Sequence, residues 1–172
     1  MPASVVRAAA DVNRQDPALA PRTLFSGLCA PIACGARAGY DVMHMNRYRD
    51  WLDQAVRDLE KARIDMEYRY WEWACFTAQQ AADKAVKGLL MARGHDVWGH
   101  AITPMIRTLP DAAPGLTAKA QLLDAHYIPP RYPNGFPQGK PADYYNQAKA
   151  EEAVRAAEDI IRFCQDHLPE PR

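Results

Sequence analysis

The segment from about Tyr70 to Arg93 constrains the fold more than any other part of this chain. Apolar residues recur around nearly its whole circumference at helical spacing, and most are small: Ala74, Phe76, Ala78, Ala81, Ala82, Ala85, Val86, Leu89 and Leu90. A helix that is apolar on almost every side is buried among neighbours, and alanine side chains let those neighbours come close. Gly94 follows and suits the left-handed stop of a helix. We therefore predict a central helix that several others contact.

One polar face interrupts this helix. Gln80, Asp83, Lys84 and Lys87 are three or four residues apart, which places them on one side of the helix. These side chains could form a surface that reaches a phosphate. Alternatively, Asp83 pairs with Lys87 across one turn and the four residues are an ordinary solvated stripe. Because the rest of the helix is apolar, we expect the polar face to lie at a seam or a cleft.

Helical spacing continues on both sides of this segment. Apolar residues recur every three or four positions after Asn46, in the order Trp51, Ala55, Leu59, Ala62 and Met66. This spacing predicts an amphipathic helix of roughly twenty residues. Pro110 and Pro114 break the chain further on. Three more helices are expected: a short one from Thr103-Pro104, one from Gly115 or Thr117 to Pro129-Pro130, and a long one from Asp143 or Tyr144 to about His167.

The segment between the last two of these helices is rich in proline and glycine. We therefore expect residues 131–141 to have no regular structure. No alternating strand pattern occurs along the chain. The predicted fold is all-α, an up-and-down bundle of about five helices.

The first 44 residues differ in amino-acid composition from the rest of the chain. They are rich in alanine and glycine, and four prolines interrupt them: Pro2, Pro17, Pro21 and Pro31. We expect residues 1–44 to be either a poorly ordered extension or a mis-annotated start, with Met43 or Met45 as the true first residue. Residues 45–170 are expected to form the single helical domain, since 172 residues suffice for one core.

Charge and cysteine content exclude several classes of function. Lys plus Arg equals Asp plus Glu at 21 each, so contact with a nucleotide or RNA must come from a local cluster. The four cysteines form no CxxC pair, which favours buried thiols in a reduced cytoplasmic protein over disulfides or a metal site. No apolar run approaches the eighteen or so residues of a membrane span. We expect no metal, no cofactor and no membrane association.

Two strings of residues are distinctive in combination. Gln79-Gln80-Ala81-Ala82-Asp83-Lys84-Ala85-Val86-Lys87 is followed some forty residues later by Arg131-Tyr132-Pro133-Asn134, with Trp51, Gly94, His100, Tyr127 and Tyr144 in order around them. This order resembles the HEPN family, named for higher eukaryotes and prokaryotes nucleotide-binding, over about residues 46–168. Family members often carry Glu for Asp83 and Asp for Asn134. The resemblance implies a small helical bundle that commonly dimerises.

The resemblance also suggests a chemistry. Many HEPN proteins are metal-independent ribonucleases or toxins in which an Arg is followed, four to six residues later, by a His. The His acts as general acid or base, and the Arg neutralises charge on the phosphate. No His follows Arg131 in that range, and His126 lies five residues before it. Arg131 and His126 are therefore candidates for a degenerate catalytic site, unless His126 is a surface or capping histidine.

The turn at Arg131 also offers a binding site. Arg131, Tyr132 and Asn134 could hold a phosphate and stack a base. Alternatively, Arg131 caps the carbonyls of the preceding helix and Tyr132 fills the end of the bundle. Earlier in the chain, Trp71 and Trp73 cannot both face one core, so we expect part of that aromatic surface to lie at a homodimer interface.

Three functional hypotheses follow from these patterns. The first is a protein that binds a nucleotide or RNA phosphate in a cleft near the dimer interface. Family behaviour suggests that such a protein works with a partner nucleotidyltransferase in a toxin–antitoxin-like or accessory system. The second is a ribonuclease toxin in which His126 or a tyrosine replaces the missing His, although tyrosine, with a pKa of about 10, is a poor base. The third is a structural interaction module without catalysis.

Overall fold

The computed structural model describes residues 47–169, and all regular structure within them is helical. Two long helices, α1 (Tyr48–Glu67) and α2 (Trp71–Ala92), come first, followed by the shorter α3 (Ile102–Arg107) and α4 (Pro114–Asp124) and the long α5 (Gln147–Asp166). Between α4 and α5 lie three single turns of 3-10 helix, η1 (Pro129–Arg131), η2 (Pro133–Gly135) and η3 (Pro141–Asp143). The predicted all-α bundle is confirmed for this part of the chain.

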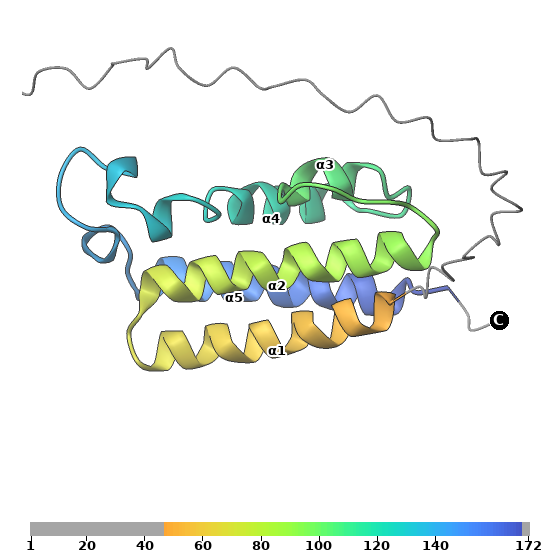
Figure 1. Cartoon of the computed structure of the whole chain (residues 1–172), viewed down its shortest axis with the longest axis horizontal. Helices are drawn as coiled ribbons and strands as arrows, with labels where there is room; N and C mark the ends of the chain where they lie inside the picture. Colours follow the sequence, from red (N-terminus) through yellow and green to blue (C-terminus); the bar gives the residue numbers. More distant parts are fainter. Residues whose placement is uncertain (1–46, 170–172) are drawn as a thin grey trace, which may run out of the picture. The chain divides into compact units, whose positions relative to one another are not determined.

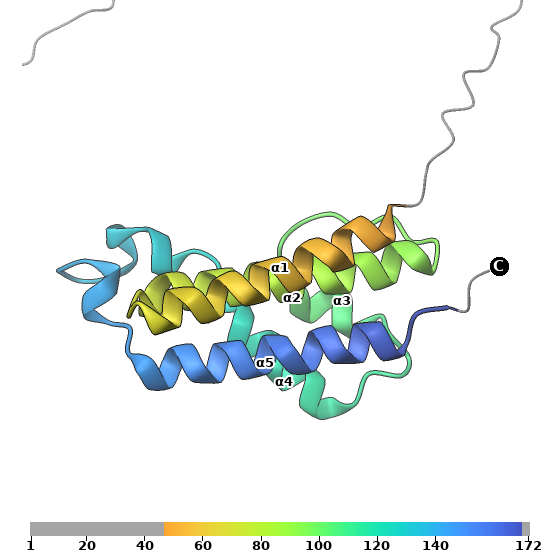
Figure 2. The same ribbon diagram turned by 90° about the horizontal axis from the view of Figure 1, so that it is seen from below.

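Helix α2 is the centre of the bundle. In Figure 1, α1 runs along one side of α2 and α3 and α4 lie along the other, with α5 behind. Figure 2, turned by 90°, shows α5 running beside α1. Helix α2 contacts all four other α-helices and η1. Five of its alanines are the reason, because they are buried with no accessible surface: Ala74, Ala78, Ala81, Ala82 and Ala85.

The close approach of α1 to α2 depends on a glycine. A Cβ atom added to Gly88 would lie 3.0 Å from Leu52 Cγ and 3.1 Å from the backbone oxygen of Tyr48. Both distances are shorter than ordinary van der Waals contacts. Helix α1 therefore packs against the backbone of α2 at this point.

Both ends of α4 differ from expectation. We expected Pro114 to break the chain before a helix at Gly115 or Thr117, but Pro114 is itself the first residue of α4. Proline fits that position because the first turn of a helix needs no N–H donors. Helix α4 ends at Asp124, and Pro129 and Pro130 belong to the separate turn η1.

The last helix begins later than predicted. Asp143 ends η3, Tyr144 follows it, and α5 starts only at Gln147. The Asn146 side chain fixes this start, because its Oδ1 accepts a hydrogen bond from the Lys149 backbone N–H at 3.0 Å. Residues 131–141 also differ from the prediction of no regular structure, since they contain η2 and the start of η3.

Several expectations fall on residues that the structure does not describe. These include the nature of residues 1–44, a start at Met43 or Met45, and the state of Cys29 and Cys34. Within residues 47–169, Cys75 and Cys164 are free and buried, and burial raises the pKa of each thiol to about 12. No helix in the described part of the chain has the length and apolar character that a membrane crossing requires.

Candidate functional site

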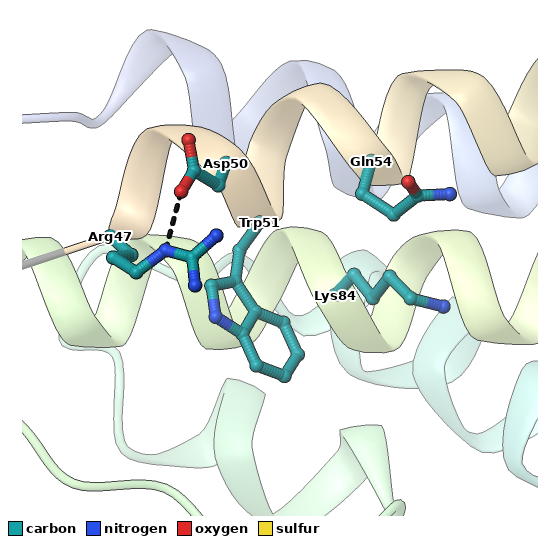
Figure 3. Close-up of a pocket in the computed structure, with 5 residues that line it drawn as sticks. All are labelled: Arg47, Asp50, Trp51, Gln54 and Lys84. Carbon is teal, nitrogen blue, oxygen red and sulfur yellow. Dashed lines mark hydrogen bonds and ion pairs between the residues drawn. The ribbon is translucent and has the colours of Figure 1, made fainter.

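The polar face of α2 does not form one surface. Lys84 turns toward α1, where its Nζ lies 2.6 Å from Oδ2 of Asp58, and Gln54 donates to the other oxygen of that carboxylate at 2.7 Å. Beside this pair is an open pocket of about 400 Å³. Figure 3 shows the residues that line it: Arg47, Asp50, Trp51, Gln54 and Lys84.

Asp83 and Lys87 pair across one turn, but they are buried rather than solvated. Lys87 Nζ lies 2.8 Å from Asp83 Oδ2, and the two side chains are 8% and 3% exposed. The ammonium also lies 5.8 Å from the centre of the Trp51 ring. The second oxygen of Asp83, Oδ1, is buried and has no hydrogen-bond partner within residues 47–169. A buried carboxylate oxygen without a donor is uncommon and costs free energy.

His100 approaches the same oxygen of the Asp83 carboxylate as Lys87 does. Its Nδ1 is 3.6 Å from Asp83 Oδ2, while 52% of the imidazole is exposed to solvent. That distance is within reach of an ion pair but is too long for a hydrogen bond. Asp83 therefore faces Lys87 within the bundle and His100 at its surface.

Hydrogen bonds from two helices hold the backbone around His100. Buried Gln79 donates from Nε2 to the His100 carbonyl at 2.9 Å, and Gln80 donates to Gln79 Oε1 at 2.7 Å. The Asp124 carboxylate, at the end of α4, accepts the N–H groups of Ile102 and Thr103 at 2.6 and 3.0 Å. These bonds satisfy donors that the first turn of α3 leaves free. The position of His100 is thus fixed on both sides of the residue.

Aromatic rings connect His100 to Arg131. The imidazole stacks on Tyr127, with the ring centroids 4.9 Å apart and the planes inclined by 21°. The guanidinium carbon of Arg131 lies 4.7 Å from the same Tyr127 centroid and 4.6 Å from that of Phe76. Tyr132 brings a third ring to within 5.1 Å of this carbon. Such cation–π contacts hold a guanidinium in place without using its N–H donors.

Arg131 uses only one of its donors within the described residues. Its Nε donates to the carbonyl of Tyr127 at 2.9 Å, so Arg131 does cap a carbonyl near the end of α4. Its two terminal nitrogens have no hydrogen-bond or ion-pair partner in the described part of the chain. Arg131 can therefore both cap the backbone and bind an anion.

Two exposed aromatic residues extend this cluster. Tyr132 is 48% exposed, so it does not fill the end of the bundle. Trp73 is 45% exposed and meets Phe76 edge-on, at 6.1 Å between ring centroids. Together they complete what we call the aromatic–arginine surface, which consists of Trp73, Phe76, His100, Tyr127, Arg131 and Tyr132.

The other predicted site residues lie apart from this surface or at its margin. Asn134 is exposed in η2, and its side chain makes no hydrogen bond within residues 47–169. Trp71 is partly buried against the core. His126 packs on Tyr145, its Nδ1 3.4 Å from the hydroxyl, and no hydrogen bond or cation–π contact joins it to Arg131 within the described residues. Burial, followed by the positive charge of Lys149, lowers the pKa of His126 to about 4.

The structure therefore divides the predicted site. Arg131 and Tyr132 belong to the aromatic–arginine surface, and Asp83 approaches it at His100. Gln80 supports this surface through Gln79. Lys84 instead faces α1, and Lys87 is buried. Sequence reasoning missed His100 and Gln79 as site residues. Gln79 could have been found, because it is one helical turn before Asp83 on the same face of α2.

The described residues contain no group of three or more His, Cys, Asp or Glu side chains that could hold a metal ion. What the site offers is one guanidinium with free donors, one exposed imidazole beside a buried carboxylate, and several aromatic rings. These groups can bind phosphate, stack on flat rings and transfer a proton.

Fold and site together define a small all-α protein with an exposed cluster of an arginine, a histidine and aromatic rings. The chain belongs to the HEPN domain family, whose sequence model matches residues 48–167. Among curated proteins, it is 23% identical over 145 residues to "Putative toxin MJ1304" of Methanocaldococcus jannaschii, covering 77% of this chain and 93% of the relative.

Solved structures of similar proteins have the same fold. The protein TT1696 of Thermus thermophilus is 44% identical, with a TM-score of 0.70, and the match covers 72% of this chain and all of that one. ST0689, an archaeal HEPN homologue, is 38% identical with a TM-score of 0.63 over 71% of this chain and 98% of its own. The HEPN domain protein TM0613 of Thermotoga maritima is 34% identical, with a TM-score of 0.57 over 71% and 99%.

Proposed function

We propose that this HEPN protein binds a nucleotide or the phosphate of an RNA at the aromatic–arginine surface. The observation that carries the proposal is Arg131, whose guanidinium lies against three aromatic rings while both terminal nitrogens lack partners within residues 47–169. A held guanidinium can donate two parallel hydrogen bonds to a phosphate at little cost in side-chain entropy. The two lysines of the polar face are less suited to bind a phosphate, because Lys84 and Lys87 are already paired with carboxylates.

The neighbouring aromatic rings favour a ligand that contains nucleobases. Tyr132, which lies against the Arg131 guanidinium, and Trp73, which packs on Phe76, each expose nearly half of their surface. Stacking on such rings contributes about 1–3 kcal/mol of binding free energy for each unpaired base, whatever the sequence. The protein carries no net charge, so affinity would come from this local combination rather than from a general positive field. An unpaired RNA strand would therefore bind more tightly than a duplex, whose bases are already stacked.

The proposal includes a homodimer with the site near its interface. Exposed aromatic residues lie beside the turn between α1 and α2, where Tyr68 is 68%, Tyr70 56% and Trp73 45% exposed. Exposed aromatic residues of this kind are enriched at interfaces between subunits. Trp71 would pack behind this interface and Trp73 would lie within it. The aromatic–arginine surface shares Trp73, so the two regions adjoin.

The biological setting that we propose is a toxin–antitoxin-like or accessory system with a partner nucleotidyltransferase. The relative named as a toxin supports the first part of this proposal. The second part, the partner nucleotidyltransferase, is proposed from the behaviour of the family. Co-purification of the native protein followed by mass spectrometry would test it, and recovery of the dimer without a nucleotidyltransferase would count against a stable complex.

Binding can be tested by fluorescence anisotropy with a short unstructured RNA, using ATP as competitor. Arg131→Ala should weaken RNA binding by about 10- to 100-fold, because a hydrogen bond to a charged group contributes about 1.5–3 kcal/mol. The matched control is Arg57→Ala, which removes an exposed arginine that pairs with Glu60 on α1. Equal loss in both variants would mean nonspecific charge attraction. No binding of RNA or ATP by the wild-type protein would favour a structural interaction module.

A further inference from the structure

We propose that the pocket at the start of α1 is a second subsite for the RNA strand and that it selects a guanine base. The inference rests on the proposed function, because Arg131 at the aromatic–arginine surface would hold the same strand. That surface offers a guanidinium for a phosphate and rings for stacking, and neither distinguishes one base from another. The pocket adds hydrogen-bonding groups that can do so.

Trp51 gives the pocket a flat wall on which a base can stack. The pocket measures about 400 Å³, and Figure 3 shows the indole between the side chains of Arg47 and Lys84 in that view. The indole is partly exposed, and the ammonium of Lys87, which does not line the pocket, lies 5.8 Å from the ring centroid. Pockets for small ligands commonly measure about 300–1,000 Å³, so there is room here for a single base.

Arg47 supplies hydrogen-bond donors beside the indole. Its Nε donates to Asp50 Oδ2 at 2.6 Å, while its two terminal nitrogens donate no hydrogen bond within residues 47–169. An end-on guanidinium matches two adjacent acceptors, and guanine presents such a pair at O6 and N7. Adenine carries an amino donor where guanine has O6, so the same arginine would meet a donor instead of an acceptor.

The acceptors in the pocket suit the other edge of guanine. Asp50 Oδ1 and Gln54 Oε1 accept no hydrogen bond within the described residues, since Asp50 is bonded through Oδ2 and Gln54 donates to Asp58 through Nε2. Guanine offers N–H donors at N1 and N2, and a carboxylate can only accept. The negative charge of Asp50 would repel a phosphate, so a base suits the pocket better than a phosphate does.

Helix α2 connects the pocket to the aromatic–arginine surface. Phe76 lies against the Arg131 guanidinium, and Lys84 lines the pocket. Gln80 lies between Phe76 and Lys84, one turn from each, and is partly exposed. Residues four apart form one ridge of a helix, and this ridge is about 12 Å long. A short single strand can therefore follow it from Arg131 to the pocket.

The test is fluorescence anisotropy with uridine-rich RNA strands in which one position, scanned along the strand, carries guanine, adenine or 7-deazaguanine. The full chain should bind the best guanine strand at least about 5-fold more tightly than the matching adenine strand, as a bidentate arginine contact predicts. 7-Deazaguanine lacks the N7 acceptor and should lose part of this preference. Equal affinity for guanine and adenine at every position would overturn the inference.

Arg47→Ala is the decisive variant, because Arg47 is exposed and lies outside the core. It should make the guanine and 7-deazaguanine strands bind equally, since the partner of N7 has been removed. Arg49→Ala is the matched control. It removes a nearby arginine of α1 whose Nε bonds the Tyr48 hydroxyl, and it should retain the guanine preference. A preference for guanine over 7-deazaguanine that persists in Arg47→Ala would contradict the assigned contact.

Trp51→Leu has a different expected signature. It should weaken the guanine and adenine strands alike, by about 5-fold or more, because stacking does not depend on which base is present. Unchanged affinity of a folded Trp51→Leu variant for every strand would overturn the stacking role. If this variant does not fold, the comparison of Arg47→Ala with Arg49→Ala still decides the question.

The outcomes separate this inference from the proposed function. RNA binding that is lost in Arg131→Ala but shows no guanine preference would overturn the inference and leave the proposed function intact. GMP is the second probe. Binding of GMP that depends on Arg47, without any gain from guanine within a strand, would overturn the assignment to RNA and indicate a site for a free nucleotide. Absence of RNA binding by the wild-type protein would remove the proposed function and the strand subsite with it.

Discussion

The ammonium of Lys87 lies 2.8 Å from Oδ2 of Asp83, and less than a tenth of either side chain is exposed. The pair lies on the central helix of the bundle, so each charge depends on the other for its neutralisation. Breaking such a pair costs far more than breaking one at the surface, because the remaining ion stays buried and uncompensated.

Lys87→Met should therefore destabilise the protein by about 3–5 kcal/mol, measured as the free energy of unfolding in urea. Lys84→Met is the control, since its pair with Asp58 is partly exposed and should contribute about 1 kcal/mol or less. The double variant Lys87→Met with Asp83→Leu should regain part of the loss, because it leaves no buried charge. Equal losses of unfolding free energy in Lys87→Met and Lys84→Met would contradict the larger contribution expected of the buried pair.

His126 should make the stability of the fold depend on pH in a defined range. Its pKa in the folded protein is about 4, below the ordinary value of 6.5. Protonation therefore favours the unfolded chain, and the contribution of neutral His126 is complete above about pH 6.5 and lost as the pH falls toward about 4. His126→Gln should show a shallower loss of stability across this range. An NMR titration of His126 with a midpoint near 6.5 would contradict the prediction.

Gly88 should tolerate no side chain. Gly88→Ala would gain about 1 kcal/mol of helix propensity, but the added Cβ meets Leu52 and the Tyr48 carbonyl at 3.0–3.1 Å. Overpacking of this kind commonly costs about 1–3 kcal/mol, so we expect a net loss of stability. Gly115→Ala, within α4, is the matched control because nothing lies within 4 Å of its added Cβ. Thermal unfolding should rank Gly115→Ala at or above wild type and Gly88→Ala below it.

The predicted dimer can be tested through its aromatic residues. Trp73→Lys should shift the protein toward monomer in analytical ultracentrifugation, because a charge would be buried in the interface. Trp98→Lys changes a residue that is 91% exposed on the loop before α3 and should not alter the mass. A monomeric wild-type protein, or dissociation only in Trp98→Lys, would refute the proposed interface.

Much of the fold could be predicted because hydrophobic spacing in a helix depends on local sequence. The alanine-rich pattern of α2 required neighbours on nearly every side, and the structure places α1, α3, α4 and α5 there. The helix starts were harder to predict. Pro114 begins α4 and Asn146 caps α5, because the backbone donors of a first turn can be absent or satisfied by a side chain.

The candidate site was harder to predict, because its contacts join residues far apart in sequence. Helical spacing correctly placed Asp83 and Lys87 one turn apart, but it could not show that both are buried. It grouped Lys84 with them, although Lys84 pairs with Asp58 on α1. The contact between Asp83 and His100 depends on the path of the loop before α3, for which periodicity contains no information.

The carboxylate of Asp124 couples the local unfolding of α3 to that of α4. By accepting the N–H groups of Ile102 and Thr103, it joins the end of α4 to the start of α3, so neither helix can open at that point without releasing the other. In native-state hydrogen exchange, the two short helices should then open as one cooperative unit. His100 lies immediately before that unit, so each opening would leave it held by the hydrogen bond from Gln79 of α2 alone.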